Sequence, residues 1–560
     1  MKKTKKILLT ALVCLTAAFG AFAFSSCDML LTILPENSET NSDLGESSSS
    51  ETENSNSSSS SSTGTPPSSG NEEIASLKFT LNDDNASYSV TGLGSYQDTH
   101  VIIPSTYKNL PVTAIAESAF RNCNNFTSVE IGDNVQSIGD SAFYSCNALT
   151  SVTIGNSVQS IGKSAFFYCD NLTNMVLPDS VQYIEENAFI NCTNLADLKI
   201  GKGLKKIEST AFSKNIKNIY ISDLTAWCNA DIEPTTLYKR AYSLYLNDEL
   251  LTELVIPKSI TNLGRASFEG CISLVSVVIP DGVQSIGAVA FRSCENLTNV
   301  VIPDSVQSEG GNAFALCPNL KYNEYENGCY LGNTNQPYLW LMKAKDENVT
   351  SLQTHSDTIY IASYAFEKNQ SLNSIVIGNK VKGIGANAFS NCHSLTNVAF
   401  GSNVQSIGEN SFSYCENLKS VEIPNSVQII KDCAFYYCSN LTSLTLGNGV
   451  ETIENSAFSY TNLSSVEIPG NVQLIGNRAF SFCKNLRDLK IGNGVQWISH
   501  YAFDNCNLQN VTFEGGKWYA AKEPSDWTNK TNGSLMLTYD SSISRDQLLK
   551  YSTYYLYSVD

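Results

Sequence analysis

Length, composition and charge already exclude several classes of protein. The chain has 560 residues, enough for three or four domains if length alone decided, but only 16% of them are charged and the formal net charge is −18. Its four histidines are scattered along the sequence. Such a composition is not typical of a metalloenzyme, and a negative surface repels the phosphate backbone of nucleic acids. We therefore expect no metal, no cofactor and no nucleic-acid partner.

The first 26 residues have the pattern of an export signal. Four lysines and no acid precede an apolar stretch at residues 7–24, and Ser25 and Ser26 lead into Cys27. This pattern predicts a secretory signal peptide. Small residues before a cysteine resemble the lipobox of bacterial lipoproteins, although Phe24 stands where leucine is usual. The resemblance implies cleavage before Cys27 and a diacylglycerol on its sulfur. The alternative is an uncleaved anchor, because about 18 apolar residues almost span a bilayer.

Residues 27–73, which begin with the cysteine, predict a flexible tether. They contain two long serine runs, nine acidic residues and no basic residue. Such a segment buries too little apolar surface to offset the entropy of ordering it. A lipid followed by a tether is the arrangement expected of a protein held away from a membrane surface, so we expect a bacterial cell-surface location.

From residue 119 onward, one phenylalanine recurs at a spacing of 22 or 23 residues within three blocks. Periods of this length indicate a solenoid, because each unit buries its apolar face only against its neighbours. Fifteen units are identified by these phenylalanines: Phe120, Phe143, Phe166, Phe189, Phe212, Phe268, Phe291, Phe314, Phe366, Phe389, Phe412, Phe435, Phe458, Phe480 and Phe503.

One unit, at residues 149–169, shows the pattern in detail. The alternation from Val152 to Ile154 predicts a short strand, which a Gly or Pro ends. Val158 and Ile161 predict a second extended segment that faces the same core, and we expect Gly162 to permit the bend after it. An Ala-Phe pair then closes the coil.

This motif resembles the leucine-rich repeats of the BspA-like, or Treponema pallidum-type, family of bacterial surface proteins. The resemblance covers residues 77–513 and implies a leucine-rich-repeat solenoid of the α/β horseshoe class, rich in β-structure, with a parallel sheet on the concave face. It also implies surface display and adhesion or protein interaction, without catalysis. The residues that carry it include Ile279-Pro280, Val283, Ile286-Gly287, Ala290-Phe291 and Cys294.

The repeats are interrupted twice and flanked by two caps. Alternating aromatic and aliphatic residues around Asn, Asp, Gly or Pro predict β-hairpins in both interruptions. Caps are expected because terminal coils would otherwise expose apolar faces and strand edges. The predicted division is an N-terminal cap at 74–111, repeats at 112–221, an insertion at 222–250, repeats at 251–320, an insertion at 321–357, repeats at 358–513 and a C-terminal cap at 514–560.

Twelve cysteines share one position of the repeat. Stacked disulfides or a metal array are conceivable there, because neighbouring coils bring α-carbons within disulfide range. Asn215, Asn369 and Thr461 occupy the same position in other units, and no zinc-type spacing is present. We therefore interpret the position as a structural ladder of buried thiols, represented by Cys146, Cys169, Cys294, Cys415 and Cys438.

Two rows of residues are candidate contact surfaces. Val255, Val278 and Val301 fall at the outward strand position of the middle block and predict an exposed apolar strip. Alternatively, the insertions fold over these valines and bury them. The second row contains stacked aromatic residues, which suit a contact with protein or glycan but are also explained as a stabilising ladder. It consists of Tyr414, Tyr437, Tyr460 and Phe482.

The sequence contains no phosphate-binding glycine loop, HExxH helix or GxSxG elbow, so we expect no enzyme and no catalytic residue. The predicted function is adhesion or protein–protein interaction by a lipid-anchored cell-surface protein. Expected partners are host matrix or mucosal proteins, glycoproteins included, or surface proteins of other microbes. Glycan capture and a structural role in the envelope are the alternatives.

Overall fold

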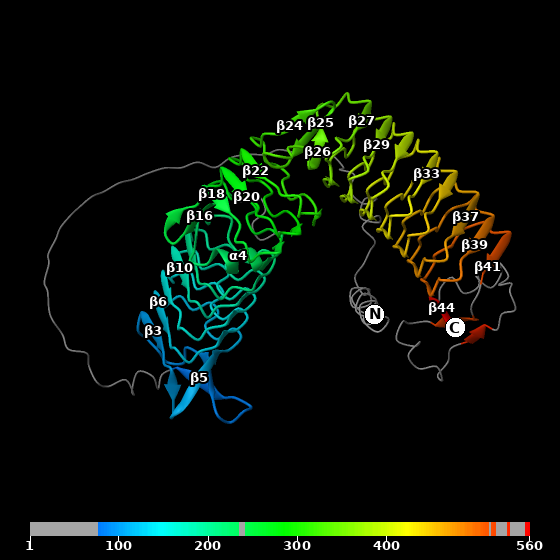
Figure 1. Cartoon of the computed structure of the whole chain (residues 1–560). Coiled ribbons are helices and arrows are strands. Elements are labelled where there is room, and N and C mark those ends of the chain that lie inside the picture. Colours follow the sequence, from blue (N-terminus) through cyan, green and yellow to red (C-terminus); the bar gives the residue numbers. More distant parts are fainter. Residues whose placement is uncertain (1–76, 235–240, 515–516, 522–534, 538–554, 560) are drawn as a thin grey trace, which may run out of the picture. The chain divides into compact units, whose positions relative to one another are not determined.

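The computed structural model describes residues 77–234, 241–514, 517–521, 535–537 and 555–559. Its chain forms successive coils stacked in sequence order, each with two short strands that pair in parallel with the same strands of the neighbouring coils. Figure 1 shows this succession from blue to red. The predicted leucine-rich-repeat solenoid is confirmed.

The first strands of successive coils form a row of parallel strands, the first ladder, which is divided into several hydrogen-bonded sheets and in which the register advances by one unit per coil. Val129 pairs with Val152, for example, and Leu198 with Ile219. The strands of this ladder are β3 (His100–Ile103), β6 (Ser128–Ile131), β8 (Ser151–Thr153), β10 (Asn174–Leu177), β12 (Asp197–Ile200), β14 (Asn218–Ile221), β16 (Ser243–Leu246), β18 (Glu253–Val255), β20 (Ser276–Val278), β22 (Asn299–Val301), β27 (Ser351–Gln353), β29 (Ser374–Val376), β31 (Asn397–Ala399), β33 (Ser420–Glu422), β35 (Ser443–Thr445), β37 (Ser465–Ile468), β39 (Asp488–Ile491) and β41 (Asn510–Phe513).

The second strand of each coil builds the other ladder. Its buried isoleucines stack directly, as Ile138 does on Ile161. The strands are β5 (Leu110–Ile115), β7 (Ser137–Ile138), β9 (Ser160–Ile161), β11 (Tyr183–Ile184), β13 (Lys206–Ile207), β15 (Asp231–Ile232), β19 (Asn262–Leu263), β21 (Ser285–Ile286), β23 (Ser308–Glu309), β28 (Tyr360–Ile361), β30 (Gly383–Ile384), β32 (Ser406–Ile407), β34 (Ile429–Ile430), β36 (Thr452–Ile453), β38 (Leu474–Ile475) and β40 (Trp497–Ile498).

The recurring phenylalanines form the spine of the core. The ring of Phe166 is fully buried, and its centroid lies 5.1 Å from that of Phe143 and 5.3 Å from that of Phe189, with nearly parallel planes. The same stacking continues in the last block, where 5.2 Å separates Phe435 from Phe458. Stacked large rings at the coil spacing explain why one residue type is repeated at this position.

The number of coils is slightly larger than predicted. The structure has about 18 turns, whereas fifteen carry the motif phenylalanine. Strands β14, β16 and β41 extend the first ladder without such a phenylalanine. Counting phenylalanines misses these coils because strand pairing needs only the alternation of buried and exposed residues.

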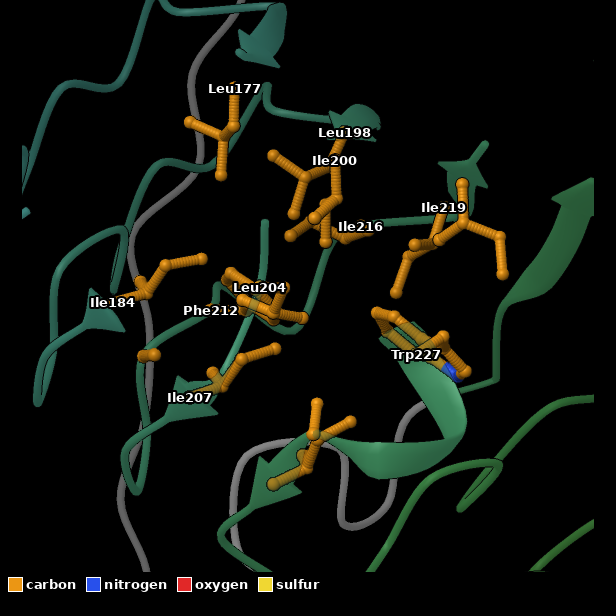
Figure 2. Close-up of a cluster of buried hydrophobic side chains, with 14 of the residues drawn as sticks. Leu177, Ile184, Leu198, Ile200, Leu204, Ile207, Phe212, Ile216, Ile219 and Trp227 are labelled. Atoms are coloured by element: carbon orange, nitrogen blue, oxygen red, sulfur yellow. The ribbon is translucent and has the colours of Figure 1, made fainter. Parts of the chain in front are cut away.

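The first insertion continues the solenoid in altered form. Strands β14 and β16 pair in parallel, as do β13 and β15, and the helix α4 (Leu224–Asn229) takes the place of the usual turn. The buried Trp227 of this helix faces the same interior as Ile219 in Figure 2. Asp223 caps the helix by accepting hydrogen bonds from two backbone amides. A hairpin then follows, formed by β16 and β17 (Glu249–Leu250).

The second insertion and the two ends add antiparallel strands. In the insertion, three strands form a meander whose last member joins the second ladder beside β28. Near the C-terminus, β44 pairs with β40 and so ends that ladder. These strands are β24 (Asn323–Tyr325), β25 (Gly328–Leu331), β26 (Trp340–Ala344), β42 (Lys517–Ala521), β43 (Leu535–Leu537) and β44 (Tyr555–Val559), with β1 (Lys78–Leu81), β2 (Tyr88–Gly92) and β4 (Thr106–Tyr107) at the other end.

The bend of each coil is made by residues that we did not predict. Gly162 does not adopt the left-handed conformation, so it does not supply the bend; a Cβ there would lie 2.8 Å from the backbone nitrogen of Asp140. The left-handed residues are Ser164 and Tyr168, with φ of 55° and 60°. Glycine is therefore used for close approach of the preceding coil, and the bend falls on side-chain-bearing residues.

Candidate functional site

The three valines of the middle block lie in register on the outward face of β18, β20 and β22. Val255 pairs with Val278, and Val278 with Val301. The first two are exposed, at 61% and 37% of their full surface, while Val301 is half-buried. Their inward neighbours Leu254 and Val277 belong to the core. We call Val255, Val278 and Val301 the valine strip.

The second insertion lies beside one end of the valine strip. Gly332 forms a parallel bridge with Val301, which accounts for the lower exposure of that valine. Val255 and Val278 remain exposed beside it. A further valine, Val275, precedes β20 and is 42% exposed, so it enlarges the apolar surface.

The surroundings of the valine strip carry more acidic than basic side chains. Glu253 shares the outward face of β18 with Val255, because residues two apart on a strand point the same way. Asp281 and Asp304 follow β20 and β22 at the same repeat position as Lys258. These three side chains and that of Glu253 are exposed. Within the described residues, no ion pair joins any of these three acids to a base.

The aromatic row is a continuous stack. Ring centroids are 5.2 Å apart between Tyr414 and Tyr437, 5.6 Å between Tyr437 and Tyr460, and 4.5 Å between Tyr460 and Phe482. Tyr437 is 38% exposed and the other three are half-buried. The buried ring of Tyr436 supports the stack from beneath, edge-on to Tyr414 and Tyr460.

This stacking limits what the aromatic row offers a ligand. The planes of neighbouring rings differ by 4° to 34°, and centroids only 4.5–5.6 Å apart leave no room for a ligand between them. A sugar that stacks on an aromatic residue needs an open ring face, and the ring faces inside this row are occupied by the neighbouring rings. The arrangement therefore favours a stabilising role or an edge contact with protein over glycan stacking.

Most of the repeated cysteines lie in the interior and hydrogen-bond the preceding coil, the exceptions being Cys123, which is half-buried, and Cys271, which contacts Ser273. The thiol of Cys146 donates to the carbonyl oxygen of Phe120 at 3.0 Å, and that of Cys415 to Phe389 at 3.2 Å. Burial raises the pKa of Cys146 and of Cys438 to about 12. The same geometry recurs at Cys169, Cys294 and Cys438, whose thiols donate to Phe143, Phe268 and Phe412.

Thr461 and Asn369, which stand at this position in other units, hydrogen-bond within their own coil instead. The hydroxyl of Thr461 donates to the carbonyl oxygen of Phe458 at 2.9 Å. The side-chain oxygen of Asn369 accepts from the backbone amides of Ser371 and Leu372. A small polar side chain is what this turn accommodates, whichever residue supplies it.

The remaining predictions concern the N-terminal anchor and the absence of a metal site. Cys27, the predicted signal peptide and the predicted tether lie outside the described residues. Within the part of the chain that is described, no helix is both long and apolar enough to cross a membrane. Nor do three or more His, Cys, Asp or Glu side chains gather there in a way that could hold a metal ion.

Sequence reasoning missed an outward aromatic pair. Tyr220 of β14 and Tyr245 of β16 lie side by side on the first ladder, with ring centroids 4.6 Å apart. Both are half-buried. They occupy the same outward position as the valines but belong to coils without a motif phenylalanine. The alternation in residues 218–221 and 243–246 was the signal that could have found them.

A profile of the BspA type leucine rich repeat region matches residues 99–229, 240–334, 344–459 and 406–519 of the chain, in six copies. The chain belongs to this family. Together with the stacked coils, the match establishes the leucine-rich-repeat class that the motif predicted. A search of the curated proteins finds no match.

Several solved structures are similar in fold. A leucine-rich repeat protein from Bacteroides ovatus is 24% identical, with 78% of this chain and 92% of that chain covered and a TM-score of 0.31. A leucine rich cell surface protein from Faecalibacterium prausnitzii is also 24% identical, covering 84% and 97%, with a TM-score of 0.30. A Treponema pallidum leucine-rich repeat protein is 23% identical, covering 44% and 88%, with a TM-score of 0.27.

Proposed function

We propose that this chain is a bacterial surface protein that binds other proteins through the valine strip. The observation that carries the proposal is that Val255 and Val278 are exposed, in register and adjacent on neighbouring parallel strands. Contiguous exposed apolar side chains rimmed by polar residues are typical of protein contact sites. Binding makes no covalent change to the partner.

Anchoring through a lipid on Cys27 completes the proposal. The small residues before this cysteine and the acidic, serine-rich segment after it support a tethered body that faces outward. Expected partners are host matrix or mucosal proteins and surface proteins of other microbes. The coil geometry supports this role because the spine is buried while the outward positions vary from coil to coil.

Adhesion of bacteria that display the full chain tests the proposal. Wild type, Val278→Glu and Val376→Glu are compared on immobilised matrix proteins, mucins and cells of other species. Val376 is a matched control, because it occupies the same outward position on β29 and is 43% exposed. We expect Val278→Glu to reduce adhesion at least tenfold and Val376→Glu to leave it unchanged. Equal adhesion by all three would contradict the proposal.

The aromatic row gives no specific support to glycan capture, because its inner ring faces are covered. A glycan array probed with the same purified proteins distinguishes the two functions. Saturable glycan binding that survives Val278→Glu would favour glycan capture over the proposed protein contact. A chain that binds neither proteins nor glycans would favour an envelope scaffold.

A further inference from the structure

The valine strip has a spacing that restricts the shape of its partner. Its three outward side chains come from neighbouring parallel strands, which lie about 4.8 Å apart. The strip therefore runs across the strands, along the stacking direction of the coils. A partner that contacts all three valines must offer side chains at nearly this interval.

An α-helix meets this requirement better than an extended segment. Apolar residues at positions i, i+4 and i+7 rise by about 5.4 Å per turn, so two steps differ from two coil spacings by only about 1 Å. In an extended segment, same-face residues are about 6.7 Å apart, and the mismatch over two steps is about 4 Å. The spacing thus favours a helix that lies along the strip.

Charge around the strip indicates what flanks the apolar stripe of that helix. On one side Glu253 shares the outward face with Val255, and on the other Asp281 and Asp304 follow the strands. The basic side chains near the strip are Lys258, at the same repeat position as the two aspartates, and Lys321, which follows the last coil of the block; both are exposed. The surplus is acidic, so lysine or arginine beside the apolar stripe complements it.

We infer that the valine strip binds an amphipathic α-helix whose aliphatic stripe is flanked by basic side chains. This inference rests on the proposed protein-binding function and specifies the partner for the same surface. The aliphatic side chains pack on Val255, Val278 and Val301, and the basic side chains reach Glu253, Asp281 and Asp304. In this mode of recognition, the partner helix binds through the apolar side chains at positions i, i+4 and i+7.

Three synthetic peptides of equal length test the inference against the purified full chain by fluorescence anisotropy. The first has leucines at i, i+4 and i+7 flanked by lysines, and the second replaces those lysines by glutamates. The third keeps the composition of the first but alternates leucine and lysine, which favours a strand. We expect saturable binding of the first peptide only. Its affinity should fall at least tenfold between about 50 and 300 mM salt, because salt screens the attraction between exposed charges over a Debye length of about 8–10 Å at intermediate concentrations.

Variants of exposed residues locate the contact without disturbing the core. Val278→Ser should weaken binding of the first peptide at least tenfold, while Val376→Ser, the matched valine outside the strip, should leave it unchanged. The double change Asp281→Asn and Asp304→Asn should weaken binding and flatten its salt dependence. Equal melting temperatures of all variants confirm that the fold is intact.

Each other outcome overturns a stated part of the inference. Equal binding of the glutamate peptide would remove the charge argument, and tighter binding of the alternating peptide would remove the helix. Binding unaffected by Val278→Ser would place the contact elsewhere. If no peptide binds although Val278→Glu abolishes adhesion to proteins, the partner class is wrong and the proposed function stands.

Discussion

At the scale of single residues, the cysteine ladder links one coil to the next. Most buried thiols of the ladder donate to the phenylalanine carbonyl of the preceding coil, as Cys415 does to Phe389 at 3.2 Å. Burial holds the pKa of Cys415 well above its ordinary value, so the thiol stays protonated and keeps donating. Thr461 occupies the ladder position in a unit without cysteine, but its hydroxyl donates to the Phe458 carbonyl of its own coil.

Removing one ladder thiol should lower the stability measurably. Cys415→Ala leaves the Phe389 carbonyl without this donor and opens a small void, which should cost about 1–2 kcal/mol of unfolding free energy. Cys415→Ser keeps a donor and should lose less. Urea unfolding followed by circular dichroism measures both, with Ser439→Ala on the exposed surface as control. An alanine variant as stable as wild type would show that the thiol serves no structural purpose.

Two carboxyl groups in neighbouring coils should make the stability depend on pH. The Glu454 carboxylate accepts a hydrogen bond from the backbone amide of Asp432 at 3.1 Å. Burial, and then the nearby charge of Asp432, raise the pKa of Glu454 to about 7 from an ordinary 4.5, with Lys431 and Glu409 as the other charged neighbours. Burial raises the pKa of Asp432 as well.

A raised carboxyl pKa means that the folded chain favours the protonated form. The contribution of protonated Glu454 to the stability of the folded chain is therefore complete below about pH 4.5 and is lost as the pH rises through about 7. Glu454→Gln should melt at a higher temperature than wild type at pH 8, and the two should differ little at pH 5. Thermal unfolding at both values tests this, with the exposed Glu451→Gln as control. Parallel pH profiles of wild type and Glu454→Gln would refute the expected linkage.

At the scale of elements, neighbouring coils approach so closely along the second ladder that glycine is favoured after many second strands. A Cβ on Gly408 would lie 2.4 Å from the Ile384 carbonyl oxygen and 2.7 Å from the Gly385 carbonyl carbon. Both are backbone atoms, which cannot rotate away. Lys431 occupies the same position one coil later, so the backbone can adjust there.

Gly408→Ala should therefore destabilise the chain moderately, by about 1–2 kcal/mol, because two coils must move apart. Lys431→Ala is the matched control: it already carries a Cβ at this position, and we expect no loss beyond about 0.5 kcal/mol. Differential scanning calorimetry compares the two. A larger loss for Lys431→Ala than for Gly408→Ala would show that close approach is not what selects glycine.

The sequence predicts the coils well because their period reflects burial. Phenylalanine spacing and the alternation around Val152 identify both strands of a repeat, and neither depends on distant parts of the chain. The coil of β14 was missed because the buried Trp227 on α4 follows this strand, and no motif phenylalanine does. The left-handed turns, such as Tyr437 with φ 56°, were missed because asparagine, serine and even tyrosine occupy them.

The candidate site was predictable only in part. The outward position of Val278 follows from strand alternation, whereas its exposure depends on where the insertions fold. The same holds for the aromatic row: its stacking follows from the repeat, but the small angle between the rings of Tyr460 and Phe482 is known only from the structure. Whether either surface binds a partner remains a prediction.

At the scale of the whole molecule, the proposed tether determines where the solenoid can act. If Cys27 carries the lipid, Cys27→Ser should release most of the protein into the medium, while wild type remains with the membrane fraction. Mass spectrometry of the N-terminal peptide should find an acylated Cys27 in wild type. External protease should degrade the wild-type solenoid on intact cells. Full protection from protease would contradict the surface location.

The central claim is that the valine strip, and not the aromatic row, is the contact surface for proteins. Carbene footprinting of the full chain, alone and saturated with a partner found by adhesion, tests it most directly. We predict that labelling falls on β18, β20 and β22, and stays unchanged on β29 and at Tyr437. Protection confined to the aromatic row, or labelling unchanged throughout β18–β22 despite saturation, would contradict the account.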